Sequence, residues 1–452
     1  MNPQRIRSRS RFLVAVSILL FTPLLYRYAQ LEFHLPHTPA LNAAPLRGRL
    51  ITEDGSVLAQ SLTLPDGSQD RRYPQGRLAG ALIGVLGTDE GLSGLERSHQ
   101  QDLQAGRDVI LTLQPWMQAS LEAHLDRRAR AHLGVSGAGV ILETHTGKIL
   151  AAASWPPLEP ARWRDHPRER WKNRPLVDSL EPGSVIKALT VASLLDQGLT
   201  HPEERFDTPM TRRVGRHTLH DAVSHPPSLT TREILRYSSN VGMSQLIERV
   251  SSEQMHWFLR QVGFGQDTPL DGLYAEDGVL HPWQKWSDIQ KANISFGQGF
   301  TANTLQVAAA FNVLANDGRY VPPHLVTAER VWDHRQVISP QTSQTMREVL
   351  RRVVEDGIQK NAGIHGYGIA GKSSTAQVVV NGRYSSEVYN SLFAGFFPSN
   401  HPKVTVVVMV HGAQKDHYGS QLAAPIFRDV AADLMSQWGL PPEAQEGQVA
   451  GR

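Results

Sequence analysis

EPGSVIK occupies residues 181–187 and sets a serine, Ser184, three positions ahead of a lysine, Lys187. If Pro182-Gly183 opens a helix, this spacing puts both side chains on one face of its first turn. A serine hydroxyl becomes a strong nucleophile only when a base takes its proton, and a lysine is a base only in its neutral form. Burial, a helix N-terminus and a second nearby cation all favour that form. Lowering the pKa of Lys187 from about 10.4 to about 7 takes roughly 4.6 kcal/mol, so burial alone is sufficient.

Two further short motifs follow along the chain, Ser238-Ser239-Asn240 and Lys372-Ser373-Ser374. Each motif alone is an ordinary turn, cap or loop sequence, and a serine and a lysine at this spacing are common on helix surfaces. Their order and spacing together indicate the active site of a serine enzyme that transfers acyl groups. In such a site Ser238 would relay the proton toward the leaving amine, and Asn240 would hold the substrate amide.

The third motif is expected to bind substrate. Lys372 would supply a fixed positive charge for a carboxylate, with the hydroxyl of Ser373 beside it. The backbone N–H groups of Ser184 and Thr375 are the expected oxyanion hole, in which each donor contributes roughly a hundredfold or more to the rate. Ser374 lies among these binding residues.

The composition restricts the function classes that are open to the chain. Its 452 residues exceed one ordinary domain and 40% of them are hydrophobic, so two unequal units with a large core are expected. Lys plus Arg number 46 against 43 Asp plus Glu, and a net charge of +3 gives no case for a nucleic-acid partner. The sequence has no cysteine, which excludes disulfides, thiolate metal sites and cysteine nucleophiles. No cofactor is expected.

The N-terminus has the pattern of a membrane anchor. Arginines at alternate positions from 5 to 11 precede an apolar run over residues 12–26, which predicts an N-terminus that stays in the cytoplasm. A run of this length spans only about 22 Å of a roughly 30 Å bilayer core, so we expect it to extend to residue 33. A cleaved signal peptide is the rival, but no small-x-small site follows closely. We therefore expect a cytoplasmic tail at 1–11 and an uncleaved anchor at 12–33.

Three segments are expected after the anchor: a short one at 34–107, a large domain at 108–440 and a flexible tail at 441–452. The short segment begins with a proline-containing linker. A hairpin over 47–59 follows, with Asp54-Gly55 as its turn.

The large domain shows strand patterns near both of its ends. The expected elements are a strand at 108–113, a helix at 115–130, a hairpin over 138–152, strands at 391–396 and 404–410, and a helix at 424–438. Mostly helical patterns lie between them, with room for an all-helical insert between the helix of Ser184 and the strand of Lys372. This order predicts an α+β fold, in which an antiparallel sheet carries a helical lobe and the site lies between the lobes.

At these residues the chain resembles the class B penicillin-binding proteins, the monofunctional D,D-transpeptidases of peptidoglycan synthesis, over nearly its whole length. Beyond the three motifs, the resemblance rests on EPG at 181–183, YSSNVGM at 237–243, FGQG at 296–299, Tyr418-Gly419 and Ala424-Pro425. SNVGM at 239–243 is similar to the septal, cell-division branch of the family. RG at 47–48 and GLE at 94–96 match the signatures of the family's N-terminal pedestal.

The resemblance implies the transpeptidase fold shared with serine β-lactamases, plus a small β-rich pedestal and one transmembrane helix. It implies that a peptidoglycan stem peptide or a β-lactam acylates Ser184, and that the acyl group passes to an amine on a neighbouring strand during septal wall synthesis. It also implies a single-pass protein of the inner membrane with a periplasmic catalytic domain. A SEDS-type glycosyltransferase and other divisome membrane proteins are the implied partners, because the chain has no polymerase region.

Two other functions stay open. A D,D-carboxypeptidase or β-lactamase-like hydrolase would use the same nucleophile and pass the acyl group to water. A weakly active division scaffold would keep the fold with an impaired site. The expected anchor and the pedestal signatures favour transfer over hydrolysis.

The chain departs from the family pattern in two respects. The segment 34–107 is shorter than the usual pedestal, which puts the partner contacts of that domain in question. Ser374 stands where the family has glycine, so a side chain lies beside the strand that should pair with substrate. Ser374 either narrows the cleft or points away from it.

Two other features are interpreted as structural. His217, His220, Asp221 and His225 lie close in sequence, but the histidines lack helical i, i+4 spacing, which favours polar loop residues over a zinc site. Gly297-Gln298-Gly299 lacks the following lysine of a nucleotide-binding loop, so we expect a tight bend at the cleft.

Overall fold

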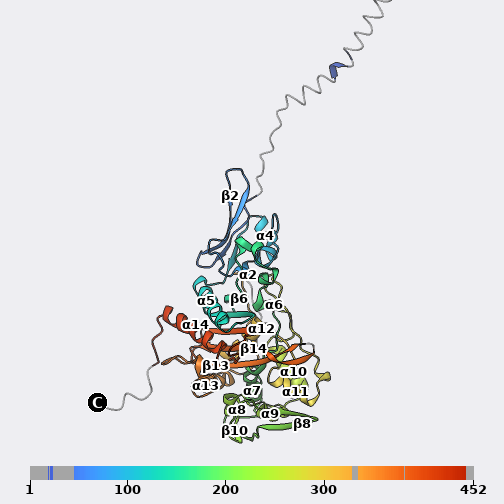
Figure 1. The fold of residues 1–452 in the computed structure, drawn as a ribbon, viewed down its shortest axis with the longest axis vertical. Helices are drawn as coiled ribbons and strands as arrows, with labels where there is room; N and C mark the ends of the chain where they lie inside the picture. The colour runs from blue at the N-terminus through green and yellow to red at the C-terminus, as the bar shows by residue number, and fades with distance from the viewer. Residues whose placement is uncertain (1–18, 20, 24–44, 328–333, 381, 444–452) are drawn as a thin grey trace, which may run out of the picture. The chain divides into compact units, whose positions relative to one another are not determined.

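The computed structural model describes residues 19, 21–23, 45–327, 334–380 and 382–443 (Figure 1). The chain separates into two units, residues 1–46 and 47–452. In the first unit, the described residues 19 and 21–23 are helical. Across the described part of the chain, no helix has both the length and the apolar character needed to span a bilayer. The anchor expected at 12–33 lies almost wholly outside the described residues, as does most of the tail expected at 441–452.

The second unit begins with a small sheet in the strand order β3-β2-β1-β4. The strands are β1 (Leu50–Thr52), β2 (Val57–Thr63), β3 (Gln69–Arg72) and β4 (Val109–Leu111). The first two form the predicted hairpin, whose turn uses Gly55 at a φ of 84° that glycine adopts without strain. β4 runs parallel to β1. The sheet therefore contains three strands from before the boundary expected at residue 107 and one strand from after it. Three short helices follow β3: α2 (Gly80–Ile83), α3 (Gly94–Ser98) and α4 (Gln100–Gln104).

A buried carboxylate holds this small domain together. Glu96, which is fully buried, accepts hydrogen bonds from Arg47 Nε at 2.8 Å and from Arg71 Nε at 2.7 Å. Arg47 also donates to the Glu96 carbonyl at 2.8 Å. Each buried charge therefore has an opposite charge and directed hydrogen bonds, the condition under which a protein tolerates buried ions.

The large domain is built on a five-stranded sheet in the order β13-β14-β15-β5-β6, in which every neighbouring pair is antiparallel. The strands are β5 (Ser136–Glu143), β6 (Ile149–Trp155), β13 (Ala370–Val380), β14 (Arg383–Phe397) and β15 (Val404–His411). The expected antiparallel sheet from both ends of the domain is therefore confirmed. The last strand in sequence, β15, occupies its centre.

Helices cover both faces of this sheet, which explains the almost continuous apolar sequence of its strands. On β15, Val406, Val408 and Val410 join a core cluster with α5 (Pro115–Ala131) and α14 (Ala423–Gln437). Val407 and Met409 face the other way and join the cluster of α7 (Ile186–Asp196) and α12 (Thr304–Ala315). Figure 1 shows α5 beside β6 and α14 near β14. Because the side chains of β15 alternate between the two faces of the sheet, α7, the helix that follows Ser184, packs on one of these faces.

The insert between Ser184 and Lys372 is not all helical, contrary to our expectation. Its strands form three small pairs: β7 (Arg205–Asp207) with β10 (Ser228–Thr230), β8 (Thr211–Val214) with β9 (His217–His220), and β11 (Arg319–Tyr320) with β12 (Arg335–Gln336). Such strands are too short to show a clear alternation of polar and apolar residues. Figure 1 shows β8 and β10 close to α8 and α9.

Helices supply the rest of the insert and the domain. The remaining α-helices are α6 (Arg174–Val177), α8 (Thr231–Tyr237), α9 (Asn240–Leu246), α10 (Ser252–Gln261), α11 (Asp288–Ser295) and α13 (Pro340–Asp356). The 3₁₀ segments are η1 (Pro160–Asp165), η2 (Arg168–Trp171), η3 (Gly183–Val185), η4 (Ile247–Arg249), η5 (Trp283–Lys285) and η6 (Lys360–Ala362).

Candidate active site

Ser184 lies in the short segment η3, which leads directly into α7. The preceding Gly183 has a φ of 59°, and its N–H donates to the carbonyl of Gly297 at 2.9 Å. A Cβ on Gly297 would lie only 2.2 Å from the Gly183 carbonyl oxygen, so only glycine fits there. The expected tight bend at 297–299 therefore holds the nucleophile segment from the side of α11 and fixes where Ser184 sits.

Lys187 lies in the first turn of α7 and is fully buried. Its Nζ donates to the Ser238 carbonyl at 2.5 Å, to Asn240 Oδ1 at 2.8 Å and to Ser238 Oγ at 3.2 Å. Burial lowers the pKa of Lys187 to about 7, against an opposing effect of the Asp221 carboxylate. This pKa agrees with the value expected from the sequence, and it favours a substantial neutral fraction of Lys187 near pH 7.

Lys372 approaches the same serine from β13 and is also fully buried. Its Nζ donates to Ser238 Oγ at 3.0 Å and to the Ser373 carbonyl at 3.1 Å. Burial, and then the charge of Lys187, lower the pKa of Lys372 well below its ordinary value. The permanent positive charge expected on Lys372 is therefore disfavoured until an anion enters the site.

The Ser238-Ser239-Asn240 turn joins α8 to α9, with Ser238 in a left-handed conformation at a φ of 59°. Ser239 caps α9 by accepting from Gly242 N at 2.8 Å. Asn240 uses its amide within the protein, because Oδ1 accepts from Lys187 while Nδ2 donates to the His220 carbonyl at 3.1 Å. Holding a substrate amide, as expected of Asn240, requires these bonds to be exchanged.

Asp221 holds this turn in place, whereas the sequence pattern indicates only a polar loop residue at this position. Its carboxylate is almost fully buried and accepts from Asn240 N at 2.5 Å and from Val241 N at 3.0 Å. It also accepts from Ser239 Oγ at 2.5 Å and bonds His225 Nε2 at 2.8 Å. Among the described residues, no group of histidine and carboxylate side chains is arranged to hold a metal ion.

Gln359 is a second positioning residue that the sequence did not reveal. It is fully buried behind β13, and its amide oxygen, assigned from its partners, accepts from Lys372 Nζ at 3.2 Å and Ser373 Oγ at 3.3 Å. Its nitrogen donates to the Val353 carbonyl at 3.0 Å. The side chains of the third motif are thereby held from the C-terminal end of α13.

Of the next two residues of β13, Ser374 contacts the nucleophile segment and Thr375 contacts Gly419. Ser374 is 2% exposed, and its Oγ accepts a hydrogen bond from the Ser184 backbone N–H at 3.0 Å. The alternative that Ser374 points away from the cleft is therefore wrong. Thr375 is half-buried, and its Oγ1 accepts from Gly419 N at 2.9 Å.

Glu181 lies just before the nucleophile segment and bonds it to two neighbouring parts of the fold. Its Oε1 accepts from Gly299 N at 2.8 Å and from the Tyr384 hydroxyl at 3.2 Å. Burial raises the pKa of Glu181 above its ordinary value. Glu181 thereby joins the bend at 297–299 to Tyr384 of β14.

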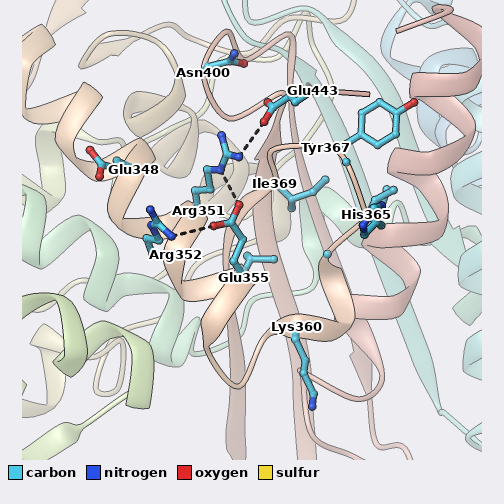
Figure 2. Close-up of a pocket in the computed structure, with 14 residues that line it drawn as sticks. Glu348, Arg351, Arg352, Glu355, Lys360, His365, Tyr367, Ile369, Asn400 and Glu443 are labelled. Carbon is cyan, nitrogen blue, oxygen red and sulfur yellow. Dashed lines mark hydrogen bonds and ion pairs between the residues drawn. The ribbon is translucent and has the colours of Figure 1, made fainter. Parts of the chain in front are cut away.

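A separate cavity of about 740 Å³ lies between α13, the loop at 363–369 and Glu443 (Figure 2). None of the residues of the three motifs lines it. Four of its charged side chains are paired with one another, since Arg351 contacts both Glu355 and Glu443 and Arg352 contacts Glu355 (Figure 2). This cavity is therefore not an extension of the site around Ser184.

Comparison with known proteins identifies two regions of the chain. Residues 137–432 match the penicillin binding protein transpeptidase domain, and residues 47–123 match the penicillin binding protein A dimerisation domain. Among relatives, the probable peptidoglycan D,D-transpeptidase PenA of Neisseria gonorrhoeae is 30% identical over 82% of this chain and 69% of that protein. The peptidoglycan D,D-transpeptidase FtsI of Escherichia coli is 28% identical over 83% of this chain and 68% of that protein.

A solved structure gives the same result for the fold. Penicillin binding protein 3 of Mycobacterium tuberculosis superimposes with a TM-score of 0.84 at 30% identity, covering 89% of this chain and 98% of that one. That protein has also been crystallised with aztreonam and with ampicillin. These matches confirm the resemblance that the motifs indicated, and the chain belongs to the penicillin-binding protein transpeptidase family.

Proposed function

We propose that this chain is a peptidoglycan D,D-transpeptidase that forms its acyl-enzyme at Ser184 and is a target of β-lactams. The observation that carries the proposal is the convergence of two buried lysines on the hydroxyl of Ser238, one of them with a pKa of about 7. A neutral amine, a second amine and a hydroxyl in hydrogen-bond contact form a path along which a proton can pass from nucleophile to leaving group. The names of the relatives support peptidoglycan as the substrate.

In the proposed reaction Lys187 takes the proton of Ser184 Oγ as this oxygen bonds to the carbonyl carbon ahead of the terminal D-alanine. Lys187 must exchange one of its bonds to Ser238 or Asn240 for this contact. The C–N bond then breaks, and the departing amine receives a proton through Ser238. An amine of a neighbouring strand attacks the acyl-enzyme, gives up a proton along the same path and releases Ser184. Lys372 and Ser373 bind the substrate carboxylate, whose charge favours a protonated Lys372.

The proposal extends to the setting of the reaction. The chain acts in septal wall synthesis as a single-pass protein of the inner membrane, with residues 12–33 as anchor and its catalytic domain in the periplasm. Its partners are a SEDS-type glycosyltransferase and other divisome membrane proteins. The arginines ahead of the apolar run and the septal type of motif at 239–243 support this setting.

Labelling with a fluorescent penicillin tests the reaction class. The wild type should give one covalent band that Ser184→Ala abolishes without unfolding the protein, and Lys187→Met should have the same effect because it keeps the stem and removes the base. Labelling that persists in either variant would contradict the assignment. Product analysis with a stem peptide and an acceptor amine separates transfer from hydrolysis.

Fractionation tests the proposed setting. The full chain should sediment with membranes, and a chain that lacks residues 1–34 should be soluble and still bind penicillin. A mature chain that begins after Ala29 or Ala44 would instead show a cleaved signal. The weakly active scaffold remains a second candidate because Ser374 contacts the backbone of Ser184, and an unlabelled wild type would favour it.

A further inference from the structure

The Ser374 hydroxyl lies against the backbone of the nucleophile segment. Its Oγ is 3.0 Å from Ser184 N and accepts that N–H. A Cβ on Gly183 would lie 2.3 Å from the same Oγ, which shows how closely the hydroxyl approaches the chain there. Because Ser374 is 2% exposed, bulk water does not compete for this contact.

This N–H group is one of the two donors expected in the oxyanion hole, together with that of Thr375. When Ser184 Oγ bonds to a carbonyl carbon, the carbonyl oxygen becomes negative, and the adjacent backbone N–H is placed to donate to it. Such a donor stabilises the transition state only when the oxyanion lies about 2.7–3.1 Å from the nitrogen. In the free protein, Ser374 Oγ already lies at this distance from Ser184 N. The Ser184 N–H cannot make a strong, well-aligned hydrogen bond to Ser374 Oγ and to the oxyanion at the same time.

β13, the strand that carries Ser374, has little room to move away from Ser184. Ser374 pairs with Leu392 of β14, and a Cβ on Gly419 would lie 2.1 Å from the Ser374 carbonyl oxygen, so backbone packs closely on that side. Rotation about the Cα–Cβ bond of Ser374 is the movement that remains, since serine has staggered alternatives. The hydroxyl can therefore leave the Ser184 N–H without displacement of β13.

We propose that the Ser374 hydroxyl occupies the oxyanion hole of the free protein and must rotate out before Ser184 can be acylated. This inference rests on the proposed function, because it concerns the rate of the same reaction. In the step affected, Ser184 Oγ bonds to the carbonyl carbon, the C–N bond breaks, and the nitrogen leaves with a proton. Ser374 takes no part in bond making and acts through the Ser184 N–H. Loss of one hydrogen bond at each turnover corresponds to roughly a five- to tenfold slower acylation.

The test compares the second-order rate of acylation by a fluorescent penicillin in the wild type, Ser374→Ala and Ser374→Gly. Alanine removes the hydroxyl and keeps Cβ, whereas glycine removes both. Both variants should be acylated about five- to tenfold faster than the wild type, with little change in melting temperature. Ser136→Ala is the matched control, because Ser136 is a buried serine on β5 of the same sheet, and its rate should equal that of the wild type. In the acyl-enzyme crystal structure, the acyl carbonyl oxygen should replace Ser374 Oγ beside Ser184 N.

Several results would overturn the inference. Faster acylation of Ser374→Gly alone would assign the effect to the bulk of Cβ, and slower acylation of both variants would mean that the hydroxyl assists the reaction. Equal rates in all three proteins at Ser184 would reject the inference and leave the proposed function intact. Absence of labelling in the wild type and in both variants would reject the proposed function and the inference together.

Discussion

Lys187 and Lys372 share one acceptor, the hydroxyl oxygen of Ser238, at distances of 3.2 and 3.0 Å from their Nζ atoms. Two charged ammonium groups cannot sit side by side in a buried site without a large cost, so the neutral form of one of them is favoured. A neutral lysine nitrogen can accept the hydrogen of Ser238 where a charged one can only donate. The protonation state of the pair therefore decides in which direction Ser238 passes a proton.

The rate of acylation should rise with pH through a midpoint near 7, because Lys187 is a base only after it loses its proton and its pKa is about 7. The measurement is the second-order rate of acylation by a β-lactam from about pH 5.5 to about pH 9. A profile that is flat across this range would show that a group other than Lys187 takes the proton of Ser184.

The stability of the wild type relative to Lys187→Met should increase above neutral pH. The pKa of Lys187 is about 7 in the folded protein and about 10.4 when unfolded, so the unfolded chain binds more protons between these values. Below about pH 7 both states are protonated and the cost of burial is fully present, whereas it declines as pH rises. The gain approaches about 1.4 kcal/mol per pH unit. Urea unfolding of both proteins near pH 7 and pH 9 measures it, and a constant difference would mean that Lys187 stays charged.

Asp221→Asn should impair the site through the turn that Asp221 holds. The asparagine loses the charge that accepts bonds from Asn240 N, Val241 N and Ser239 Oγ. We expect a loss of about 1–3 kcal/mol in unfolding free energy and an acylation rate lower by about one to two orders of magnitude. The pH midpoint should also move down, since the Asp221 charge raises the pKa of Lys187. His217→Ala, at an exposed position of β9, the strand just before Asp221, is the control and should change neither the stability nor the acylation rate.

Glu96→Ala should destabilise the small N-terminal domain by about 3–5 kcal/mol, because it leaves Arg47 and Arg71 without their buried counter-ion. Chemical denaturation should therefore show this loss, while the acylation rate below the transition stays that of the wild type. Glu90→Ala removes an exposed carboxylate of the same domain and serves as the control. Equal stability of Glu96→Ala and the wild type would mean that the buried charges are not coupled to folding.

The sequence predicts the larger elements of the fold because their patterns are local. The hairpin of β5 and β6, the helix α5 and the terminal helix α14 each show a period that follows from one buried face. The paired strands at 205–230 escape prediction because each is only a few residues long.

The sequence predicts the residues of the site that belong to motifs. It does not predict the distant residues that hold the motif residues in position. Ser184, Lys187, Ser238 and Lys372 lie in motifs, and the fold brings the lysines to one serine. Asp221 and Gln359 act through bonds to the motifs that only the tertiary structure creates. The direction of the Ser374 side chain depends likewise on how β13 lies against η3, which no local pattern encodes.

The central position of β15 has a consequence for how the protein is made. β5 and β6 are made before the other strands of this sheet, yet the strand that joins them to β13 and β14 is β15 (residues 404–411), which is made after the other four. A nascent chain that already contains Ser184, Lys187 and even Lys372 still cannot close its sheet. It must keep apolar strand edges unpaired until β15 has been made, a state prone to aggregation and to attack by proteases. Catalytic competence therefore waits for the synthesis of β15, and a chain that terminates before residue 404 lacks the strand that joins β14 to β5.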